Sequence, residues 1–104
     1  MTTIVVLFNL KTDADSEAYE QWAIQSDLKT VRGLSAIDRF DVLRTNGILG
    51  QESAPPYQYI EILEVNDMST FGTEVATETM RGIAAQFREF ADSPMFITCQ
   101  SIEA

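Results

Sequence analysis

A carboxyl group at position 61 interrupts a stretch that otherwise has the composition of a β-strand. The stretch YQYIEILEV covers residues 57–65, and alternation along a strand puts Glu61 on the same face as Tyr57 and Tyr59. A carboxyl group buried among apolar side chains has a raised pKa and can transfer protons near neutral pH. We therefore predict that Glu61 and Tyr59 are catalytic and that Tyr57 contacts the substrate. The alternative is that Glu61 faces a solvated edge or pairs with an arginine across the sheet.

Three polar residues of neighbouring strands are candidates for the same site. Asn9 ends the first predicted strand and could join the glutamate and a tyrosine in one polar cluster, or it could only begin the next loop. Arg39 could neutralise Glu61 or bind an acidic substrate, and Asp38 beside it is a second candidate for substrate binding. The alternative for Asp38 and Arg39 is a mutual or cross-strand ion pair at the edge of the sheet.

The sequence contains no histidine and only one cysteine, Cys99. These counts exclude Ser-His-Asp and Cys-His catalysis, histidine-ligated haem, and zinc or iron sites that need a histidine. One thiolate cannot hold a metal ion alone, and the chain has no glycine-rich phosphate loop. We therefore predict that the protein needs no metal, haem or flavin cofactor. Acid–base chemistry then depends on carboxyl groups, tyrosine or lysine.

The charge of the chain restricts its partners. Seven basic residues against 16 acidic ones give a net charge of −9, which argues against binding to nucleic acid or to an anionic membrane surface. No apolar stretch is long enough to span a membrane, and the N-terminus lacks the basic region of a signal peptide. A single cysteine allows no intrachain disulfide bond, so we predict a cytoplasmic protein.

The elements that must position these residues alternate in a recognisable order. The 104 residues predict one domain, 1–104. The order βαββαβ predicts an α+β, ferredoxin-like fold, with a four-stranded antiparallel sheet and two helices on one face. A helix break is expected near residues 77–79. The predicted strands cover residues 3–10, 34–45, 57–65 and 95–102, and the predicted helices cover residues 13–30 and 68–91.

The first predicted strand is apolar on both faces, unlike a strand with one wet face. Ile4, Val6 and Phe8 lie on one face, and Val5 and Leu7 lie on the other. The helices can cover only one of these faces. A second copy of the chain is the simplest cover for the other, so we predict a homodimer.

The isoleucines on either side of Glu61 predict which way it points. Ile60 and Ile62 are expected to pack beneath the helices, where a charge is most costly. Glu61 and Tyr59 are then expected on the opposite face of the sheet, toward the partner. In that position, the carboxyl group needs a hydrogen-bonding partner or a raised pKa.

Three segments of the chain resemble a known family. They are YEQWAIQSDLKTVRGLSAIDRFDVLR (residues 19–44), YIEILEVNDMSTF (59–71) and AAQFREFAD (84–92). Their order and spacing are similar to those of EthD-type proteins of the dimeric α/β-barrel superfamily, and in particular to the RedY-like (HapK-type) group of prodigiosin biosynthesis.

The resemblance implies a homodimer with facing sheets, and a pocket between sheet and helices or inside the barrel. It also implies a small-molecule enzyme of secondary metabolism that acts on an aromatic or pyrrolic intermediate by cofactor-free proton transfer, as in cyclisation or isomerisation. Where relatives carry a histidine near the end of the first helix, this chain has Asp27, an acid that could act at the mouth of the pocket. The alternatives are an exposed or capping Asp27 and, for the whole protein, a non-catalytic carrier of a pathway intermediate.

Overall fold

Four antiparallel strands form one sheet in the spatial order β2-β3-β1-β4. The structure is a computed structural model that describes residues 1–103. This strand order, with helices on one face, is the ferredoxin-like α+β fold that the sequence predicts. The strands are β1 (Thr2–Leu10), β2 (Ile37–Arg44), β3 (Tyr59–Val65) and β4 (Ala91–Cys99).

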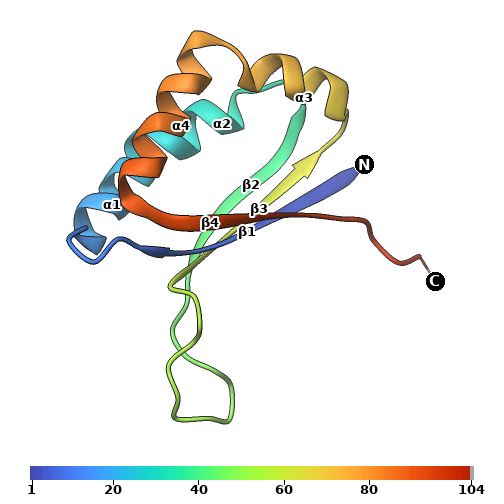
Figure 1. The fold of residues 1–104 in the computed structure, drawn as a ribbon. Helices are drawn as coiled ribbons and strands as arrows, with labels where there is room; N and C mark the ends of the chain where they lie inside the picture. The colour runs from blue at the N-terminus through green and yellow to red at the C-terminus, as the bar shows by residue number, and fades with distance from the viewer. Residues whose placement is uncertain (104) are drawn as a thin grey trace.

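Two helical segments cover one face of the sheet and leave the other bare (Figure 1). The first consists of α1 (Ser16–Trp22), a π-helical turn η1 (Ala23–Asp27) and α2 (Leu28–Arg32). The second is divided into α3 (Met68–Val75) and α4 (Glu78–Phe90). Thr77 caps α4 by accepting a hydrogen bond from the backbone N–H of Met80, so the predicted break near residues 77–79 is confirmed.

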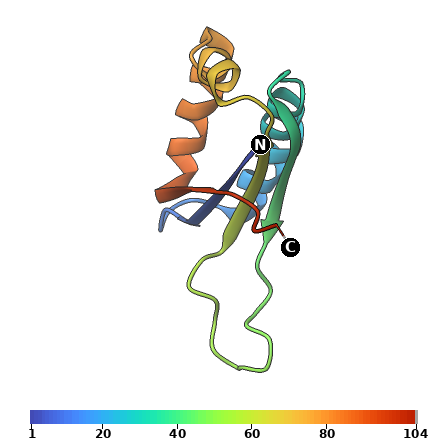
Figure 2. The ribbon, with the colours of Figure 1, turned by 90° about the vertical axis from the view of Figure 1, so that its right-hand side faces the viewer.

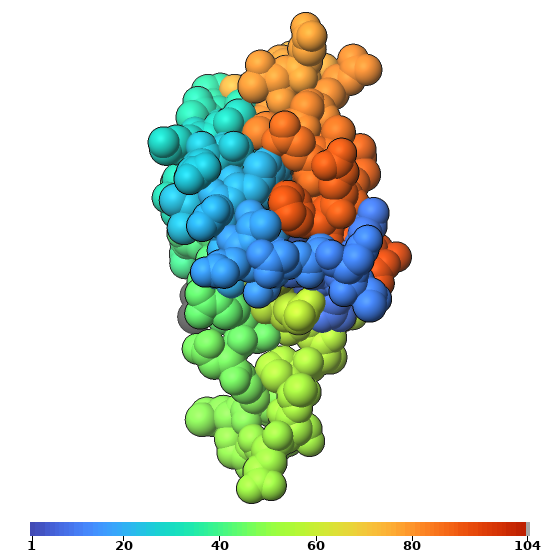
Figure 3. Space-filling view, turned by 90° about the vertical axis from the view of Figure 1, so that its left-hand side faces the viewer, coloured from blue at the N-terminus to red at the C-terminus, as the bar shows by residue number. Residues whose placement is uncertain are grey.

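The helical face and a long loop account for most of the visible surface in Figure 3, where α1 and α2 lie beside α4. The loop of residues 45–58 connects β2 to β3 and projects beyond the end of the sheet (Figures 1 and 2). None of the helices described within residues 1–103 is long and apolar enough to cross a membrane.

Strand β1 is apolar on both sides, as expected, and only one side is covered. Val6 and Phe8 are fully buried beneath the helices. On the other side Val5 lies opposite Ile62, and Leu7 lies opposite Ile60. This bare face of the sheet, which we call the outer face, also carries the partly exposed side chains of Leu43, Met95 and Ile97.

The predicted direction of Glu61 is wrong. Glu61 lies opposite Val6 in the register of β1 and β3 and is 5% exposed, so it points beneath the helices. The direction of β3 is fixed by the larger residues on either side, because Tyr59 lies opposite Phe8 and Leu63 opposite Ile4. With a period of two, Glu61 must share their face. The cost of burying its charge is avoided if the carboxyl group keeps its proton.

Candidate functional site

A cavity of about 330 Å³ lies between the sheet and the helices, with Asp27 and Glu61 in its lining. We call it the dyad cavity. The remaining lining residues come from β1, β2, β3, β4, α2, α3 and α4, and all but Thr98 are apolar. They include Phe40, Phe71, Met80, Ile83, Ala84, Phe87 and Phe96. An apolar cavity with a few polar groups is the usual form of a small-molecule site.

Asp27 reaches this cavity from the π-helical turn. In η1 the backbone N–H of Leu28 donates to the carbonyl of Ala23, five residues back, which widens the helix locally. Asp27 is 5% exposed and its side chain makes no capping hydrogen bond to α2, so the alternatives of an exposed or a capping Asp27 are wrong. Burial raises the pKa of Asp27 to about 7. Such π-helical turns occur frequently at functional sites.

Glu61 lines the same cavity as Asp27 but belongs to strand β3. Burial, with the nearby charge of Asp27 as a smaller cause, raises the pKa of Glu61 to about 8. Its Oε2 atom is buried and has no hydrogen-bond partner within the described part of the chain. A buried acceptor without a partner is destabilising. Glu61 also lines the dyad cavity, so a ligand there lies against its carboxyl group.

Tyr19 is a third polar group at this site, and the sequence analysis did not single it out. Its side chain is fully buried, and its hydroxyl has no hydrogen-bond partner among residues 1–103. The hydroxyl lies near enough to Glu61 to oppose the rise in the pKa of that carboxyl group, although the two groups do not form a well-aligned hydrogen bond. Tyr19, Ala23 and Asp27 recur every four residues and are all buried, and this spacing was a usable signal.

The two carboxyl groups titrate as a pair near neutral pH. Because each charge disfavours the other, the values near 7 and 8 describe the pair as well as the single residues. One group can keep a proton while the other is ionised. A proton donor and a proton acceptor then face the same apolar cavity, which is the arrangement required for general acid–base catalysis.

The hydroxyl of Tyr59 belongs to a different network. The side chain of Tyr59 is buried on the same face as Glu61, as predicted, but its hydroxyl donates to Oε2 of Glu20 at 2.7 Å. Glu20 also accepts two hydrogen bonds from Arg44, at 2.6 and 2.8 Å. Burial and the bond to Glu20 raise the pKa of Tyr59 to about 12. Tyr59 therefore supports the site through its ring, which stacks on Phe8 with centroids 5.6 Å apart.

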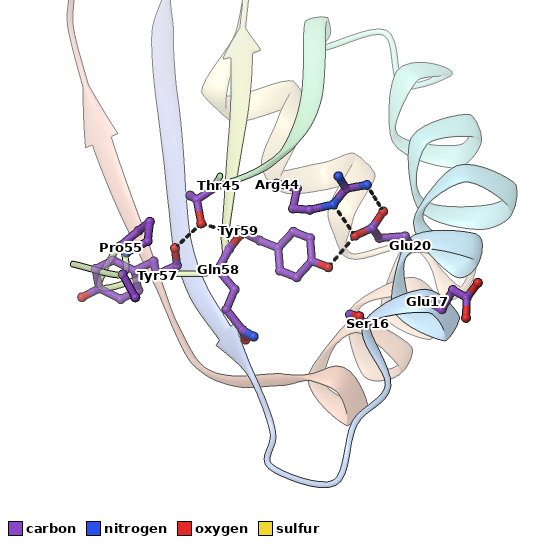
Figure 4. Close-up of a pocket in the computed structure, with 10 residues that line it drawn as sticks. Ser16, Glu17, Glu20, Arg44, Thr45, Pro55, Tyr57, Gln58 and Tyr59 are labelled. Atoms are coloured by element: carbon purple, nitrogen blue, oxygen red, sulfur yellow. Dashed lines mark hydrogen bonds and ion pairs between the residues drawn. The ribbon is translucent and has the colours of Figure 1, made fainter. Parts of the chain in front are cut away.

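A second cavity, of about 520 Å³, lies at the base of the 45–58 loop around this network (Figure 4). Tyr57 lines it and is turned away from Glu20. Hydrogen bonds from Arg44 and then Tyr59 lower the pKa of Glu20 to about 2. The charges of Glu20 and Arg44 are thus satisfied by each other. This cavity is the larger, but the dyad cavity is lined by Glu61, whose Oε2 atom is unpaired in the described structure, and it is the stronger candidate.

Asn9 fastens the loop instead of joining the carboxyl groups. Its Nδ2 donates to the carbonyl of Pro56 at 3.1 Å, and its Oδ1 accepts from the backbone N–H of Gln58 at 2.9 Å. The predicted cluster of Asn9 with Tyr59 and Glu61 is wrong, because both polar atoms of the Asn9 side chain bond to the backbone of the loop while Tyr59 and Glu61 are buried beneath the helices.

Arg39 and Asp38 also lie outside the dyad cavity. Arg39 is exposed and pairs with Asp41, with 2.5 Å between Nε and Oδ2. Asp38 accepts a hydrogen bond from Nδ2 of Asn66 at 2.8 Å. The prediction that Arg39 neutralises Glu61 is wrong. The alternative of a mutual or cross-strand ion pair is also wrong, because Arg39 pairs with Asp41 of its own edge strand and Asp38 bonds to Asn66. A bulge between Ile37 and Arg39 accompanies this arrangement.

Within residues 1–103, no group of three or more histidine, cysteine or acidic side chains is arranged to hold a metal ion. The fold and the cavity define a ferredoxin-like α+β protein with a largely apolar cavity between its sheet and its helices. The family model described as REDY-like protein HapK matches residues 2–102. The chain belongs to this family, so the resemblance seen in the sequence is confirmed.

Solved structures agree with this assignment. HapK from Hahella chejuensis is 27% identical, with a TM-score of 0.80 over 100% of this chain and 95% of its own. An EthD-family protein from Bacillus halodurans is 14% identical, with a TM-score of 0.74 over 98% of this chain and 99% of its own. A dimeric ferredoxin-like protein from Thermobifida fusca is 13% identical, with a TM-score of 0.72 over 94% of this chain and 88% of its own. The comparison with curated proteins gives no match.

Proposed function

We propose that this protein is a cofactor-free enzyme of secondary metabolism that transfers protons to and from a small molecule in the dyad cavity. The observation that carries the proposal is Glu61, a buried carboxyl group that faces Asp27 and has an oxygen without a hydrogen-bond partner in the described structure. The membership of the chain in the REDY-like HapK family supports the metabolic role. We propose that the enzyme acts in the prodigiosin-type pathway that the resemblance implies. We also propose that it acts in the cytoplasm.

The reaction that suits the pair is a cyclisation or isomerisation. One carboxylate removes a proton from an atom of the substrate, and the other carboxyl group returns a proton to a second atom. The substrate is then rearranged with no net gain or loss of protons or electrons. The apolar walls exclude water, which strengthens each charge interaction inside the cavity. They also suit an aromatic or pyrrolic substrate.

The second candidate function is a carrier that holds an intermediate without changing it. The nearly continuous apolar wall of the dyad cavity favours this function, as does the absence of histidine from the sequence. The two acids in the lining, with the hydroxyl of Tyr19 close to Glu61, favour the enzyme. A carrier of an uncharged, apolar ligand gains nothing from a carboxyl group that costs free energy to bury.

A nitrobenzisoxazole can separate these functions. Its ring opens when a base removes a carbon-bound proton, and the phenolate product is coloured. We expect the protein to open the ring at a rate that rises with pH and levels off above about 8, because Glu61 must be ionised to act as the base. Glu61→Gln should reduce the rate by about 100-fold, a usual contribution of one general base.

The control is Glu89→Gln, which neutralises an exposed carboxylate of α4. It should leave the rate unchanged. Equal rates for the wild-type protein and Glu61→Gln would contradict the enzyme. If the probe binds in the cavity without being opened, the carrier is supported.

A further inference from the structure

The charges around the dyad cavity are all of one sign. Its ionisable lining residues are Asp27 and Glu61, and no lysine or arginine of the described chain lines it. The nearby cation Arg44 is held by Glu20 at 2.6 Å. The ionisable groups that face the pair are therefore the two acids themselves and the hydroxyl of Tyr19. Helices α3 and α4 and strands β1, β2 and β4 contribute no ionisable side chain to the lining.

This one-sided charge, with an unpaired oxygen, points to the kind of ligand. We propose that the dyad cavity binds an aromatic cation, such as a protonated amine or imine attached to a ring, with its nitrogen against Asp27 and Glu61. This inference rests on the proposed function, since it names the substrate class of the same site. The ligand donates its N–H groups to Oε2 of Glu61, which accepts no hydrogen bond from the rest of the described structure.

An anionic ligand is disfavoured by the same arrangement. A carboxylate or phosphate that enters the cavity loses its hydration and meets no cation in return, which is among the costliest changes in a protein interior. A neutral ligand avoids this cost. Its hydrogen bonds to the two carboxyl groups, however, carry a charge on the protein side at most. A cation forms charge-assisted hydrogen bonds, which are roughly twice as strong as neutral ones.

The size and walls of the cavity fit a ring with a short side chain. Its volume is about 330 Å³, at the lower end of the usual range for small-molecule sites of about 300–1,000 Å³. The rings of Phe40, Phe71, Phe87 and Phe96 are among its walls. The apolar end therefore receives the ring, and the acidic end receives the nitrogen.

The proposal predicts that binding releases a proton. In the free protein the raised pKa values of Asp27 and Glu61 mean that the pair retains protons at neutral pH. A bound cation favours the ionised carboxylates, so its binding displaces a proton to the solvent. The affinity should therefore increase as the pH rises toward about 8 and then level off.

Three probes of matched shape test the charge preference: phenethylamine, phenethyl alcohol and hydrocinnamate, which are respectively cationic, neutral and anionic. Titration calorimetry at pH 7 should give phenethylamine an affinity about tenfold above that of the alcohol, the difference expected between charged and neutral hydrogen bonds. Hydrocinnamate should bind least. Repeating the amine titration in two buffers of different ionisation enthalpy should reveal the released proton.

Two variants locate the binding. Glu61→Gln and Asp27→Asn should abolish the preference for the amine and the proton release, while binding of the alcohol remains. Ala84→Trp fills the cavity from α4 and should prevent binding of both probes. Because the surface of the protein is itself acidic, with a net charge of −9, it also attracts the amine, and a signal from inside the cavity is needed. A shift of the Glu61 carboxyl carbon in the NMR spectrum on addition of phenethylamine, in the wild-type protein, would locate the amine without any variant.

Equal or stronger binding of hydrocinnamate, amine binding that Glu61→Gln leaves unchanged, or no amine binding at all would each overturn the proposal. These results are independent of the nitrobenzisoxazole reaction. If ring opening depends on Glu61 while the charge preference is absent, the substrate class is wrong and the enzyme stands. If the preference is present without ring opening, the cavity binds cations and the enzyme is contradicted.

Discussion

At the scale of single residues, Glu61 links the stability of the fold to pH. An unfolded glutamate loses its proton near pH 4.3, whereas burial keeps Glu61 protonated until its pKa of about 8. Between these values the folded state holds a proton that the unfolded state has released, so stability falls as the pH rises through this window. Asp27 acts in the same direction, with its pKa raised to about 7 by burial.

Glu61→Gln should remove the contribution of Glu61 to this dependence. Below pH 4 the variant and the wild-type protein should unfold at similar denaturant concentrations. Above pH 8 the variant should be more stable by about 2 kcal/mol, since each unit of pKa shift corresponds to about 1.36 kcal/mol and part of the shift is relieved by relaxation around the charge. Denaturant unfolding at a series of pH values measures this difference. Glu89→Gln should show no such pH-dependent gain, and a variant less stable than wild type at pH 8 would refute the explanation.

Tyr19→Phe tests the second unpaired group. The hydroxyl of Tyr19 is buried without a hydrogen-bond partner in the described chain, so its removal should change the unfolding free energy by less than about 1 kcal/mol. The same hydroxyl opposes the rise in the pKa of Glu61, so the variant should raise that pKa further. Carbon-13 NMR of the Glu61 carboxyl group measures the shift. A pKa that is unchanged or lower would show that Tyr19 does not act on the pair.

Sequence alone predicted that Glu61 is a buried carboxyl group but not its direction. The prediction assumed that a charge is excluded from beneath the helices, and it overlooked that a protonated carboxyl group is not charged. The cross-strand contacts that orient Glu61, Tyr59 with Phe8 and Leu63 with Ile4, depend on register. Both faces of β3 carry large apolar side chains, Tyr59 and Leu63 on one and Ile60 and Ile62 on the other, so local composition alone did not decide which face turns toward the helices.

At the scale of elements, the walls of the dyad cavity depend on how each helix begins. Helix α3 supplies Phe71 and Val75 to the wall. Its N-cap is Asp67, whose Oδ1 accepts from the backbone N–H groups of Ser69 and Thr70 at 2.9 and 3.2 Å. This cap stabilises the first turn of α3, which contains part of the wall of the dyad cavity.

Asp67→Ala should lower the unfolding free energy by about 1 kcal/mol, the usual cost of losing a helix N-cap. It should also weaken the binding of phenethyl alcohol, because α3 packs less firmly over the cavity. Asp67→Asn is the matched control, since asparagine caps equally well. Thermal melts and calorimetry of the three proteins measure both effects. Equal loss in the Asn variant would attribute the effect to charge instead of capping.

The order of the elements could be predicted from the sequence, but two local features could not. Strand β4 begins at Ala91, four residues before the predicted start, and passes through Pro94. It lies at the sheet edge, where a strand tolerates proline. The π-helical turn that carries Asp27 was not predicted either, because it differs from an α-helix by the spacing of a few hydrogen bonds. No composition signal marks that difference.

At the scale of the whole molecule, the outer face of the sheet is the feature that the single chain leaves unexplained. Val5 and Leu7 lie on it beside Ile60 and Ile62, and it has no helix above it (Figure 1). A contiguous apolar surface of this kind usually marks an interface. The prediction made from the two apolar faces of β1 is that a second copy of the chain packs on this outer face and forms a homodimer.

Ile97→Glu tests this homodimer directly. Ile97 lies on the outer face opposite Val5 and is 38% exposed in the single chain. A carboxylate there would be buried without a partner when two sheets meet, which costs several kcal/mol. The variant should therefore sediment as the 11.6 kDa monomer at micromolar concentration. The wild-type protein should sediment at twice that mass. Leu49→Glu is the control. Leu49 is fully exposed in the 45–58 loop, so this variant should leave the dimer intact. Since the dyad cavity lies on the opposite side of the sheet, monomeric Ile97→Glu should still bind phenethyl alcohol if it remains folded. A wild-type protein that sediments only as a monomer would mean that the outer face has some other cover.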